Sequence, residues 1–422
     1  MKILFVHNNI PGQYKHLLTY YSENTEYEVA CIGDASNAIQ EQSFNKNIHI
    51  YNYKMPSKII GHKHPYISNF EVQVLRGQHT ACKADEVKKN GFKPDVICVH
   101  PGWGEGLYLR DVFPDAKILT FCEFYYNSKN ADVDFELEKP LPLEKLQQIR
   151  TKNAAQLISI AAGDWGVSPT NWQKNQYPEI IRKRIIVIHD GIDTDIAKPN
   201  KDAYIVMSRA GKIKADDEII TFVSRNLEPY RGFHIFVQAL PLIQKKRPKA
   251  RIIIVGGNER GYGSAPPSKT TYRDLFMSRV KDKVDMSRIY FLGRIPYTQL
   301  INLLQISAAH VYLTYPFVLS WSMLEAMACG CAVIGSRTQP VEEVIEHGKN
   351  GILVDFFSPE EIAEAVDDVL TNKEKKNSLG KAAREAILQK YDLKKICLPA
   401  QIKLIDDLAH NSRDYILEQP YF

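Results

Sequence analysis

The stretch Tyr315–Gly335, YPFVLSWSMLEAMACGCAVIG, decides the fold class of this chain. An apolar run ends near Thr314, and a short loop leads into a helical pattern from about Ser320 to Ala328. Gly330 follows, and the next apolar run begins directly after it. A strand, a helix and a second strand in this order form the repeating unit of a parallel sheet.

The same alternation of short apolar runs and helical patterns continues along the whole chain. Runs that are apolar on both faces, separated by helices, indicate a parallel sheet that is covered on both sides. The predicted strands are Ile3–His7, Glu28–Ile32, Ile48–Tyr53, Val96–His100, Lys117–Phe121, Gly166–Ser168, Ile185–His189, Ile219–Val223, Arg251–Val255, Ile289–Leu292, His310–Leu313, Ala332–Gly335 and Gly351–Val354. Two successive doubly wound, Rossmann-like α/β halves that face a cleft are the simplest account of this series.

The length of 422 residues also favours two domains, because it is too great for one hydrophobic core. We expect a first domain over residues 1–200 and a second over 201–392, with the hinge in the polar segment Lys198–Asp217. The last helix, about 393–422, is expected to pack back on the first domain.

Composition narrows the class of protein. Hydrophobic residues make up 44% and charged residues 24%, as in soluble globular proteins. No apolar run is long enough to span a membrane, and the apolar start of the chain is too short for a signal peptide. We therefore expect a cytoplasmic protein. The seven cysteines include no CxxC pair, which favours reduced, buried thiols over a zinc site or a disulfide framework.

The formal net charge of +5 lies entirely in the chain beyond residue 200. This excess is too sparse for a nucleic-acid surface, but it suits a small phosphorylated ligand in the second half.

Polar side chains gather at the start of the helix in the opening stretch. Ser320 and Ser322 offer hydroxyls where the first N–H groups of the helix have no helical partner, which makes this helix end suitable for a phosphate. Glu325 lies one to two turns further on, and its carboxylate can accept hydrogen bonds from two vicinal hydroxyls, such as those of a ribose. The alternative is a capped core helix in which Glu325 only interacts with the helix dipole.

A second polar segment, VSRNLEPYRG at Val223–Gly232, follows the first strand of the second half. Arg225 and Arg231 flank a turn there, and two guanidiniums fixed near one strand end can neutralise a diphosphate. The alternative is a pair of solvated surface arginines.

The segments VSRNLEPYRG, VGG, FLGRIPY, LEAMACGCAVIGS and VEEVIEHGKNGILV resemble, in this order, the nucleotide-binding half of glycosyltransferase family 4. They cover nearly all of residues 219–370. HPGWGE, FCEFYY, VSPTNWQ and IHDGID in the first half resemble a bacterial subgroup of the same family. The resemblance implies the GT-B fold, a nucleotide-sugar donor and retention of the anomeric configuration.

The resemblance also implies roles for residues of the second half. Arg225 and Arg231 match the Arg and Lys that hold the donor diphosphate, and Glu325 matches the second glutamate of a paired motif, which holds the ribose. The first glutamate, which helps to position the donor sugar in the family, is replaced here by Phe317. The other residues expected to contact the donor in this half are Arg294, Ile295, Val318, Leu319, Ser320, Trp321 and Ser322.

The first half is expected to supply the acceptor site and part of the donor site. Gly12 lets the backbone approach a ligand, and a helix begins near Gln13. His100 ends a strand, and in the family a His at about this point contacts the donor sugar; the alternative is a buried, satisfied histidine. Glu105 and Glu123 follow neighbouring strands and could bind acceptor hydroxyls.

We expect no cofactor and no metal, because Arg225, Arg231 and helix N–H groups could stabilise the departing diphosphate. The family implies same-face substitution in a hexosyltransferase-type reaction, with a UDP- or GDP-sugar as donor. The acceptor would be a glycan or a lipid-linked glycan of bacterial surface polysaccharide synthesis. Two alternatives remain open: a non-catalytic GT-B module that binds glycan or a partner subunit, which the loss of the first glutamate would fit, and another GT-B enzyme such as an epimerase or a phosphorylase.

A basic segment raises the hypothesis of peripheral contact with the inner face of the plasma membrane. Residues 51–93 carry eight Lys and Arg against four acidic residues, the last of them just beyond the segment at Asp95, and apolar side chains are interleaved. The alternative is an ordinary solvated surface. The basic residues are Lys54, Lys58, Lys63, Arg76, Lys83, Lys88, Lys89 and Lys93.

Overall fold

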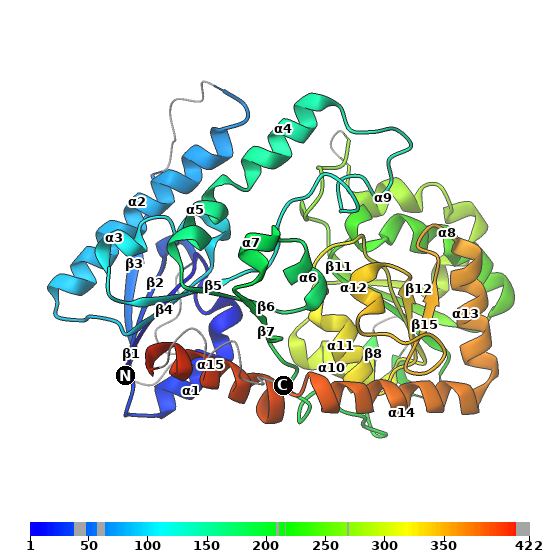
Figure 1. Cartoon of the computed structure of the whole chain (residues 1–422). Coiled ribbons are helices and arrows are strands. Elements are labelled where there is room, and N and C mark those ends of the chain that lie inside the picture. Colours follow the sequence, from blue (N-terminus) through cyan, green and yellow to red (C-terminus); the bar gives the residue numbers. More distant parts are fainter. Residues whose placement is uncertain (38–47, 57–63, 208–210, 216, 268–269, 411–422) are drawn as a thin grey trace. The chain divides into compact units, whose positions relative to one another are not determined.

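The computed structural model describes residues 1–37, 48–56, 64–207, 211–215, 217–267 and 270–410 (Figure 1). The chain divides into two compact units, Met1–Asp190 together with Lys394–Phe422, and Gly191–Leu393. The first unit therefore ends at Asp190 rather than at residue 200, and the C-terminal segment is part of it.

A seven-stranded parallel sheet forms the centre of the first unit, in the order β3-β2-β1-β4-β5-β6-β7. All seven strands predicted for this half are present: β1 Lys2–Val6, β2 Glu28–Asp34, β3 Ile48–Tyr53, β4 Val96–Val99, β5 Lys117–Phe121, β6 Trp165–Ser168 and β7 Ile185–Val187. The strand order reverses at β1, which has β2 on one side and β4 on the other. The carboxyl ends of β1 and β4 are thus the switch point at which open α/β sheets bind ligands.

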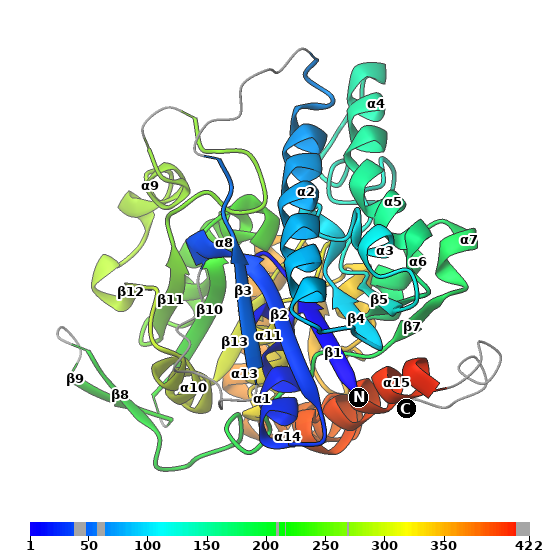
Figure 2. The ribbon, with the colours of Figure 1, turned by 90° about the vertical axis from the view of Figure 1, so that its left-hand side faces the viewer.

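Alternation along β1 shows why its sequence is apolar throughout. Ile3 and Phe5 contribute to one core cluster, and Leu4 and Val6 to a second cluster on the opposite face, all fully buried. Helices α1 and α15 cover the first face and lie side by side, while α2 covers the second (Figures 1 and 2). The helices of this unit are α1 Lys15–Glu23, α2 Ser68–Lys89, α3 Leu109–Val112, α4 Leu143–Lys152, α5 Ala154–Ala162, α6 Asn171–Asn175, α7 Glu179–Arg182 and α15 Leu398–His410.

A six-stranded parallel sheet forms the second unit, in the order β12-β11-β10-β13-β14-β15. Its strands are β10 Ile219–Asn226, β11 Arg251–Gly257, β12 Ile289–Gly293, β13 Ala309–Tyr312, β14 Val333–Ser336 and β15 Ile352–Val354. They confirm the six strands predicted for this half. Here the order reverses between β10 and β13, so the segments that carry Arg225, Arg231 and Ser320 all leave the sheet at its switch point.

Helices cover both faces of the second sheet. On one face α8 packs against α13, and Phe222 of the central strand stacks on Phe236 at a ring distance of 4.7 Å. On the other face α10, α11 and α14 share a large core with β10 and β11. The helices of this unit are α8 Phe233–Lys246, α9 Tyr272–Met277, α10 Tyr297–Ile306, α11 Trp321–Ala328, α12 Gln339–Glu342, α13 Pro359–Thr371 and α14 Lys373–Lys390.

The segment expected to be the hinge is not a simple linker. It contains β8 Tyr204–Met207 and β9 Gly211–Lys214, which pair in an antiparallel hairpin and belong to the second unit (Figure 2). Ile213 of this hairpin is fully buried in the core of that unit. The polar composition of the segment suggested a linker, but only Ile213 of β9 is buried, and a strand that buries one face can be polar on the other.

The basic segment 51–93 is described only in part, and its residues Lys58 and Lys63 lie outside the described residues. Within α2, Lys83 forms an ion pair with Glu86, and Lys89 forms one with Asp85. Over the residues that the structure describes, no helix has the length and apolar character needed to cross a bilayer.

Candidate functional site

The two arginines of the second unit occupy different environments. Arg225, the second-to-last residue of strand β10, is exposed and makes no hydrogen bond or ion pair with a described residue. Arg231 ends a short 3-10 helix, Pro229–Arg231, and is only 5% exposed. Its Nη1 atom donates hydrogen bonds to the Tyr312 hydroxyl at 3.1 Å, to the Thr314 hydroxyl at 2.9 Å and to the Val318 carbonyl at 2.9 Å. Arg231 therefore fixes the loop that follows β13.

That loop delivers the start of helix α11. Ser320 is the N-cap residue, and its hydroxyl accepts a hydrogen bond from the backbone N–H of Ser322. The Ser320 N–H in turn donates to the Tyr312 hydroxyl at 2.8 Å, so Tyr312 joins Arg231 to the helix start. Trp321 is exposed at the first helical position, and Leu319 packs against the core.

Glu325 lies on the buried side of α11, with 7% of its surface exposed. Burial raises the pKa of its carboxyl group, and hydrogen bonding to the Tyr297 phenol lowers it in part. Tyr297 begins α10, and burial followed by the Glu325 charge raises its own pKa. A buried carboxylate with a tyrosine beside it can still accept a hydrogen bond from a ligand hydroxyl.

Phe317 lies in a cluster of aromatic rings next to Arg231. Its ring is 4.8 Å from that of Tyr262 and 5.4 Å from that of Tyr230, and the Arg231 guanidinium lies 5.3 Å from the Tyr262 ring. Glu228 holds the loop that carries Tyr262, because its carboxylate accepts a hydrogen bond from the Gly263 N–H at 3.1 Å. Burial raises the pKa of Glu228, while the Gly263 N–H and the Arg231 charge oppose this shift.

Arg294 lies where β12 ends and is exposed. Its Nη2 atom pairs with the Glu259 carboxylate at 2.8 Å and donates to the Asn226 side-chain carbonyl at 3.2 Å. These contacts join the carboxyl ends of β10, β11 and β12 into one edge. The next residue, Ile295, is half-buried and packs against the core.

In the first unit, Gly12 makes room for His7. Its backbone has a φ of +47°, and a Cβ atom there would lie 2.7 Å from Cε1 of the His7 ring. His7 directly follows β1 and is almost fully buried. Its Nδ1 atom accepts a hydrogen bond from the Asn9 N–H at 2.8 Å, so the ring proton lies on Nε2. Burial lowers the pKa of His7 to about 3, assisted by the charge of His100, so the ring is neutral at neutral pH.

A chain of hydrogen bonds runs from His7 to a carboxylate. The Nε2 atom of His7 lies 2.7 Å from Oε1 of Gln13, and the Gln13 amide nitrogen donates to Oε1 of Glu123 at 3.1 Å. The other oxygen of Glu123 lies 3.4 Å from Nε2 of His100. Burial would raise the pKa of Glu123, but hydrogen bonding and charge from His100, together with His7, lower it overall. The carboxylate is therefore ionised and has acceptor sites on both oxygens.

His100 directly follows β4, and its ring lies between two aromatic side chains. It stacks on Trp103 at a ring distance of 4.4 Å and on Phe121 at 5.5 Å. Its Nδ1 atom accepts a hydrogen bond from the Gly102 N–H at 3.2 Å, which leaves the ring proton on Nε2. His100 is thus buried, as one interpretation of the sequence allowed, and its protonated nitrogen faces Glu123.

Helix α2 holds the loop after His100. The Gln73 amide donates to the Gly102 carbonyl at 3.0 Å, and Arg76 donates to the Trp103 carbonyl at 3.4 Å. Gly104 has a φ of +109°, and a Cβ atom there would collide with the Gln73 backbone. This close approach explains the glycine-rich PGWGEG sequence.

Glu105 does not reach a ligand-binding surface, contrary to the hypothesis drawn from the sequence. It is fully buried, and its carboxylate accepts a hydrogen bond from the Tyr53 hydroxyl at 2.9 Å and lies 3.7 Å from Nε of Arg76. Burial raises the pKa of Glu105, and the Arg76 charge opposes this shift. The residue stabilises the packing of β3 and α2 beneath the loop.

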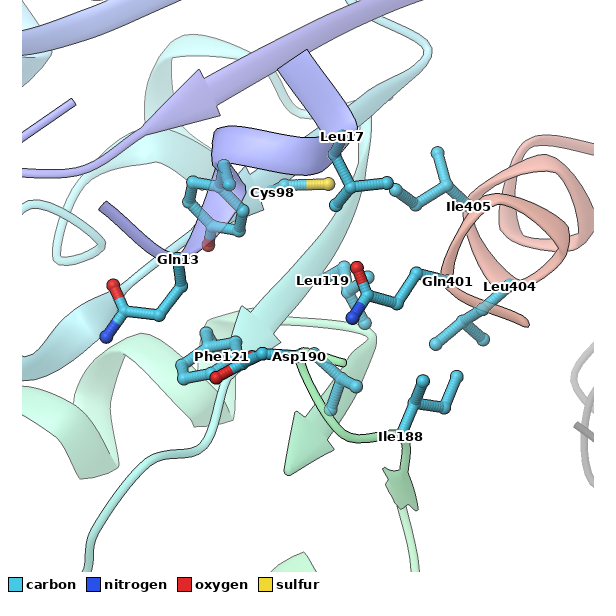
Figure 3. Close-up of a pocket in the computed structure, with 12 residues that line it drawn as sticks. Gln13, Leu17, Cys98, Leu119, Phe121, Ile188, Asp190, Gln401, Leu404 and Ile405 are labelled. Atoms are coloured by element: carbon cyan, nitrogen blue, oxygen red, sulfur yellow. The ribbon is translucent and has the colours of Figure 1, made fainter. Parts of the chain in front are cut away.

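A small cavity lies behind this site in the first unit (Figure 3). Its volume is about 20 Å³, close to that of a single water molecule, so no sugar fits inside it. The residues that line it are Gln13, Tyr14, Leu17, Cys98, Leu119, Phe121, Val167, Ile188, Asp190, Gln401, Leu404 and Ile405. Gln401 also donates to the His189 carbonyl at 2.9 Å, which ties α15 to the segment after β7.

Sequence reasoning missed four residues of these two sites. His7 and Trp103 complete the cluster around His100, and Glu228 and Tyr262 complete the cluster around Arg231. His7 carried a usable signal, because it follows the first strand just as His100 follows β4. Tyr262 carried none, since its role depends on a loop folding back on Phe317.

Comparison with known proteins identifies the family to which both halves of the chain are similar. Residues 26–197 match the family described as glycosyl transferase family 4 group, and residues 206–386 match glycosyl transferases group 1. An uncharacterized glycosyltransferase of Methanocaldococcus jannaschii is 25% identical over 389 residues, which is 90% of this chain and 89% of the relative.

Two solved structures show the same fold. Sucrose-phosphate synthase from Thermosynechococcus elongatus has a TM-score of 0.73 at 18% identity, over 97% of this chain and 99% of its own. HepE from Anabaena, in complex with UDP, has a TM-score of 0.67 at 16% identity, over 96% and 99% of the two chains. With its two Rossmann-like domains and the two family matches, the chain belongs to glycosyltransferase family 4 and has the GT-B fold.

Proposed function

We propose that this enzyme transfers a hexose from UDP-sugar to a hydroxyl group of a glycan or glycolipid, with retention of the anomeric configuration. The observation that carries the proposal is the second-unit site at the switch point of β10 and β13. An exposed arginine at the end of β10 and a capped helix start with a buried carboxylate after β13 lie at the ends of two neighbouring strands, which suits a diphosphate and a ribose. UDP is favoured because HepE, which shares the fold, binds it.

In this proposal Arg225 binds the donor diphosphate directly. Arg231 is largely occupied by Tyr312, Thr314 and Val318, so its main effect is to hold the loop and to add positive charge beneath it. The N–H groups of Ser320 and Ser322 already donate to Tyr312 and to the Ser320 hydroxyl, so the start of α11 would attract the phosphate oxygens through the positive end of the helix dipole. Glu325 would accept hydrogen bonds from the ribose. Charge on the leaving diphosphate is then stabilised without a metal ion.

The donor site is tested by thermal-shift titration with UDP, GDP, ADP and TDP in the presence of EDTA. A ligand at about 100 times its Kd adds about 2.7 kcal/mol of stability. We expect UDP to raise Tm in the wild type and in Arg288→Ala, whose arginine lies at the amino end of β12, and not in Arg225→Ala. If UDP raises Tm only when a divalent metal ion is added in place of EDTA, metal independence is refuted. No shift with any nucleotide would favour the non-catalytic module that the loss of the first glutamate to Phe317 suggested.

The stereochemical part of the proposal is tested by NMR of the product formed from an α-linked donor. Retention requires an α-linkage, and a β-linkage would refute it. We further propose that the acceptor belongs to bacterial surface polysaccharide synthesis and that the protein works in the cytoplasm at the inner face of the plasma membrane. Flotation with vesicles that contain anionic lipid tests the membrane contact, and absence of binding would exclude it.

A further inference from the structure

The cluster His7–Gln13–Glu123–His100 of the first unit is partly exposed at Gln13 and Glu123, while its surroundings are aromatic and buried. His7, His100 and Phe121 are buried, whereas the Glu123 side chain is 35% exposed. Trp103, whose ring stacks on that of His100, is also partly exposed. An accessible carboxylate beside an aromatic face is suited to a molecule with hydroxyl groups on its edge and C–H groups on its face.

The hydrogen bonds fix which atoms remain available to such a molecule. His7 uses both of its ring nitrogens, and Gln13 uses its carbonyl toward His7 and its amide toward Glu123. An ionised carboxylate has about four acceptor positions, and the Gln13 amide occupies one of those of Glu123. The contact of 3.4 Å between His100 Nε2 and Glu123 Oε2 is longer than a typical hydrogen bond. A charged, partly exposed acceptor thus lies beside a buried proton donor, the Nε2 atom of His100, which has no hydrogen-bond partner among the described residues.

We propose that Glu123 is a binding residue for a hydroxyl group of the sugar substrate, with His7 and Gln13 as positioning residues that orient its carboxylate. A hydroxyl both donates and accepts, so it can donate to Oε2 of Glu123 and accept from Nε2 of His100. The ligand class is a neutral, polyhydroxylated sugar whose apolar face packs on Trp103. This inference rests on the proposed function, because it assigns the sugar side of the same transfer reaction.

Position supports this role for Glu123. It lies two residues after β5, the neighbour of β4 in the sheet, so it reaches the carboxyl edge from a third strand. Gln13 reaches the same edge from the turn before α1, and its amide orientation is fixed, because a flipped amide would face the N–H of His7 with another donor. Three separate segments of the chain, which carry His7 with Gln13, His100 and Glu123, therefore place one carboxylate at the carboxyl edge of the sheet.

Binding is tested by saturation-transfer NMR titration of the full chain with methyl α-D-glucopyranoside, and with methyl 2-amino-2-deoxy-α-D-glucopyranoside as a cationic probe. We expect the neutral probe to bind the wild type and to bind Glu123→Gln at least tenfold more weakly, since a Gln amide would place a donor against His100. Glu28→Gln, a carboxylate at the amino end of β2, is the matched control and should bind as the wild type does. Equal affinity of wild type and Glu123→Gln for the neutral probe would overturn the proposal. So would binding of the cationic probe alone.

The positioning role is tested by a double-mutant cycle. Gln13→Ala should weaken binding of the neutral probe about threefold or more, and adding it to Glu123→Gln should change nothing further, because the two act on one carboxylate. Additive losses would show that Gln13 does not act through Glu123. Each variant is also titrated with UDP, which reports on the second unit. If the wild type does not bind UDP but the glycoside results are as expected, the donor assignment is refuted and the role of Glu123 stands. If UDP binds but the glycoside results fail, the role of Glu123 alone is refuted.

Discussion

At the scale of single residues, Arg225 and Arg231 carry the same charge six positions apart, and the fold gives them opposite surroundings. Arg225 is exposed, whereas Arg231 is buried under the loop after β13 with three hydrogen bonds from one nitrogen. The first is available for a ligand, and the second is a structural cation that also contributes a local positive potential.

This contrast predicts two different mutant phenotypes. Arg225→Ala should change the free energy of unfolding by less than about 0.5 kcal/mol, because it removes a surface side chain. Arg231→Ala should cost about 2–4 kcal/mol, because it removes charged hydrogen bonds and leaves the Val318 carbonyl without this donor. Urea unfolding measures both values. Equal destabilisation by the two substitutions would show that the burial of Arg231 contributes nothing to stability.

At the scale of structural elements, each candidate site includes a loop whose backbone is fixed by hydrogen bonds from another element. Helix α2 holds the His100 loop through Gln73 and Arg76, and the 3-10 helix that ends at Arg231 holds the loop before α11. In both cases the loop leaves the sheet next to its central strand. The supporting contacts are made to backbone carbonyls, so they fix the path of the loop whatever its side chains are.

The fit of the His100 loop on α2 can be tested with two glycines. Gly104→Ala should destabilise the protein by about 2–4 kcal/mol, because it combines a positive φ with a collision against the Gln73 backbone. Gly91→Ala is the matched control: its φ is +87°, but no atom lies within 4 Å of the added Cβ, so only the backbone strain of about 1 kcal/mol remains. Denaturant unfolding compares the two, and equal losses would mean that the loop has room to move away from α2.

At the scale of the whole molecule, the chain crosses between its units twice, and the last helix completes the core of the first one. Leu404 and Ile405 of α15 are buried with residues of α1 and of the sheet. Part of the stability of the first unit therefore depends on residues that follow the entire second unit in sequence.

Leu404→Ala tests this dependence on α15. It should lower the free energy of unfolding by about 2–5 kcal/mol, the range for a buried leucine, and change the affinity for UDP less than twofold. Calorimetry gives the first value and nucleotide titration the second. A loss of stability below about 1 kcal/mol would indicate that α15 is not a required part of the core.

Buried histidines predict how the stability of the protein depends on pH. Burial lowers the pKa of His7 and of His310 to about 3 and that of His189 to about 4, below the value of about 6.5 in an unfolded chain. Between these values the unfolded state binds more protons than the folded state, so stability falls as pH decreases. Each histidine contributes about 1.4 kcal/mol per pH unit in that window and nothing above about pH 7.

Unfolding free energies measured from pH 8 to pH 4 check this expectation. The slope below pH 6 should be smaller in His310→Gln than in the wild type, because one of the three groups is removed. His310 is a suitable choice because it lies within the second sheet, on β13, where its Nδ1 atom contacts the Thr221 hydroxyl. An unchanged slope in this variant would contradict its assignment as a neutral buried histidine.

The sequence by itself determined the α/β class, all thirteen strands of the two parallel sheets and the grouping of Arg225, Arg231 and Glu325 within one half of the chain. These features depend on the local period of apolar residues and on short motifs, which a sequence displays directly. Tertiary structure alone decided that Arg231 is buried, that Glu105 is enclosed and that Tyr204–Met207 pairs with Gly211–Lys214. It also decided that His7, Gln13, Glu123 and His100 lie in one chain of polar contacts. Such outcomes depend on strand order and on which loop packs against which element, and side-chain contacts of this kind leave no periodic signal in the sequence.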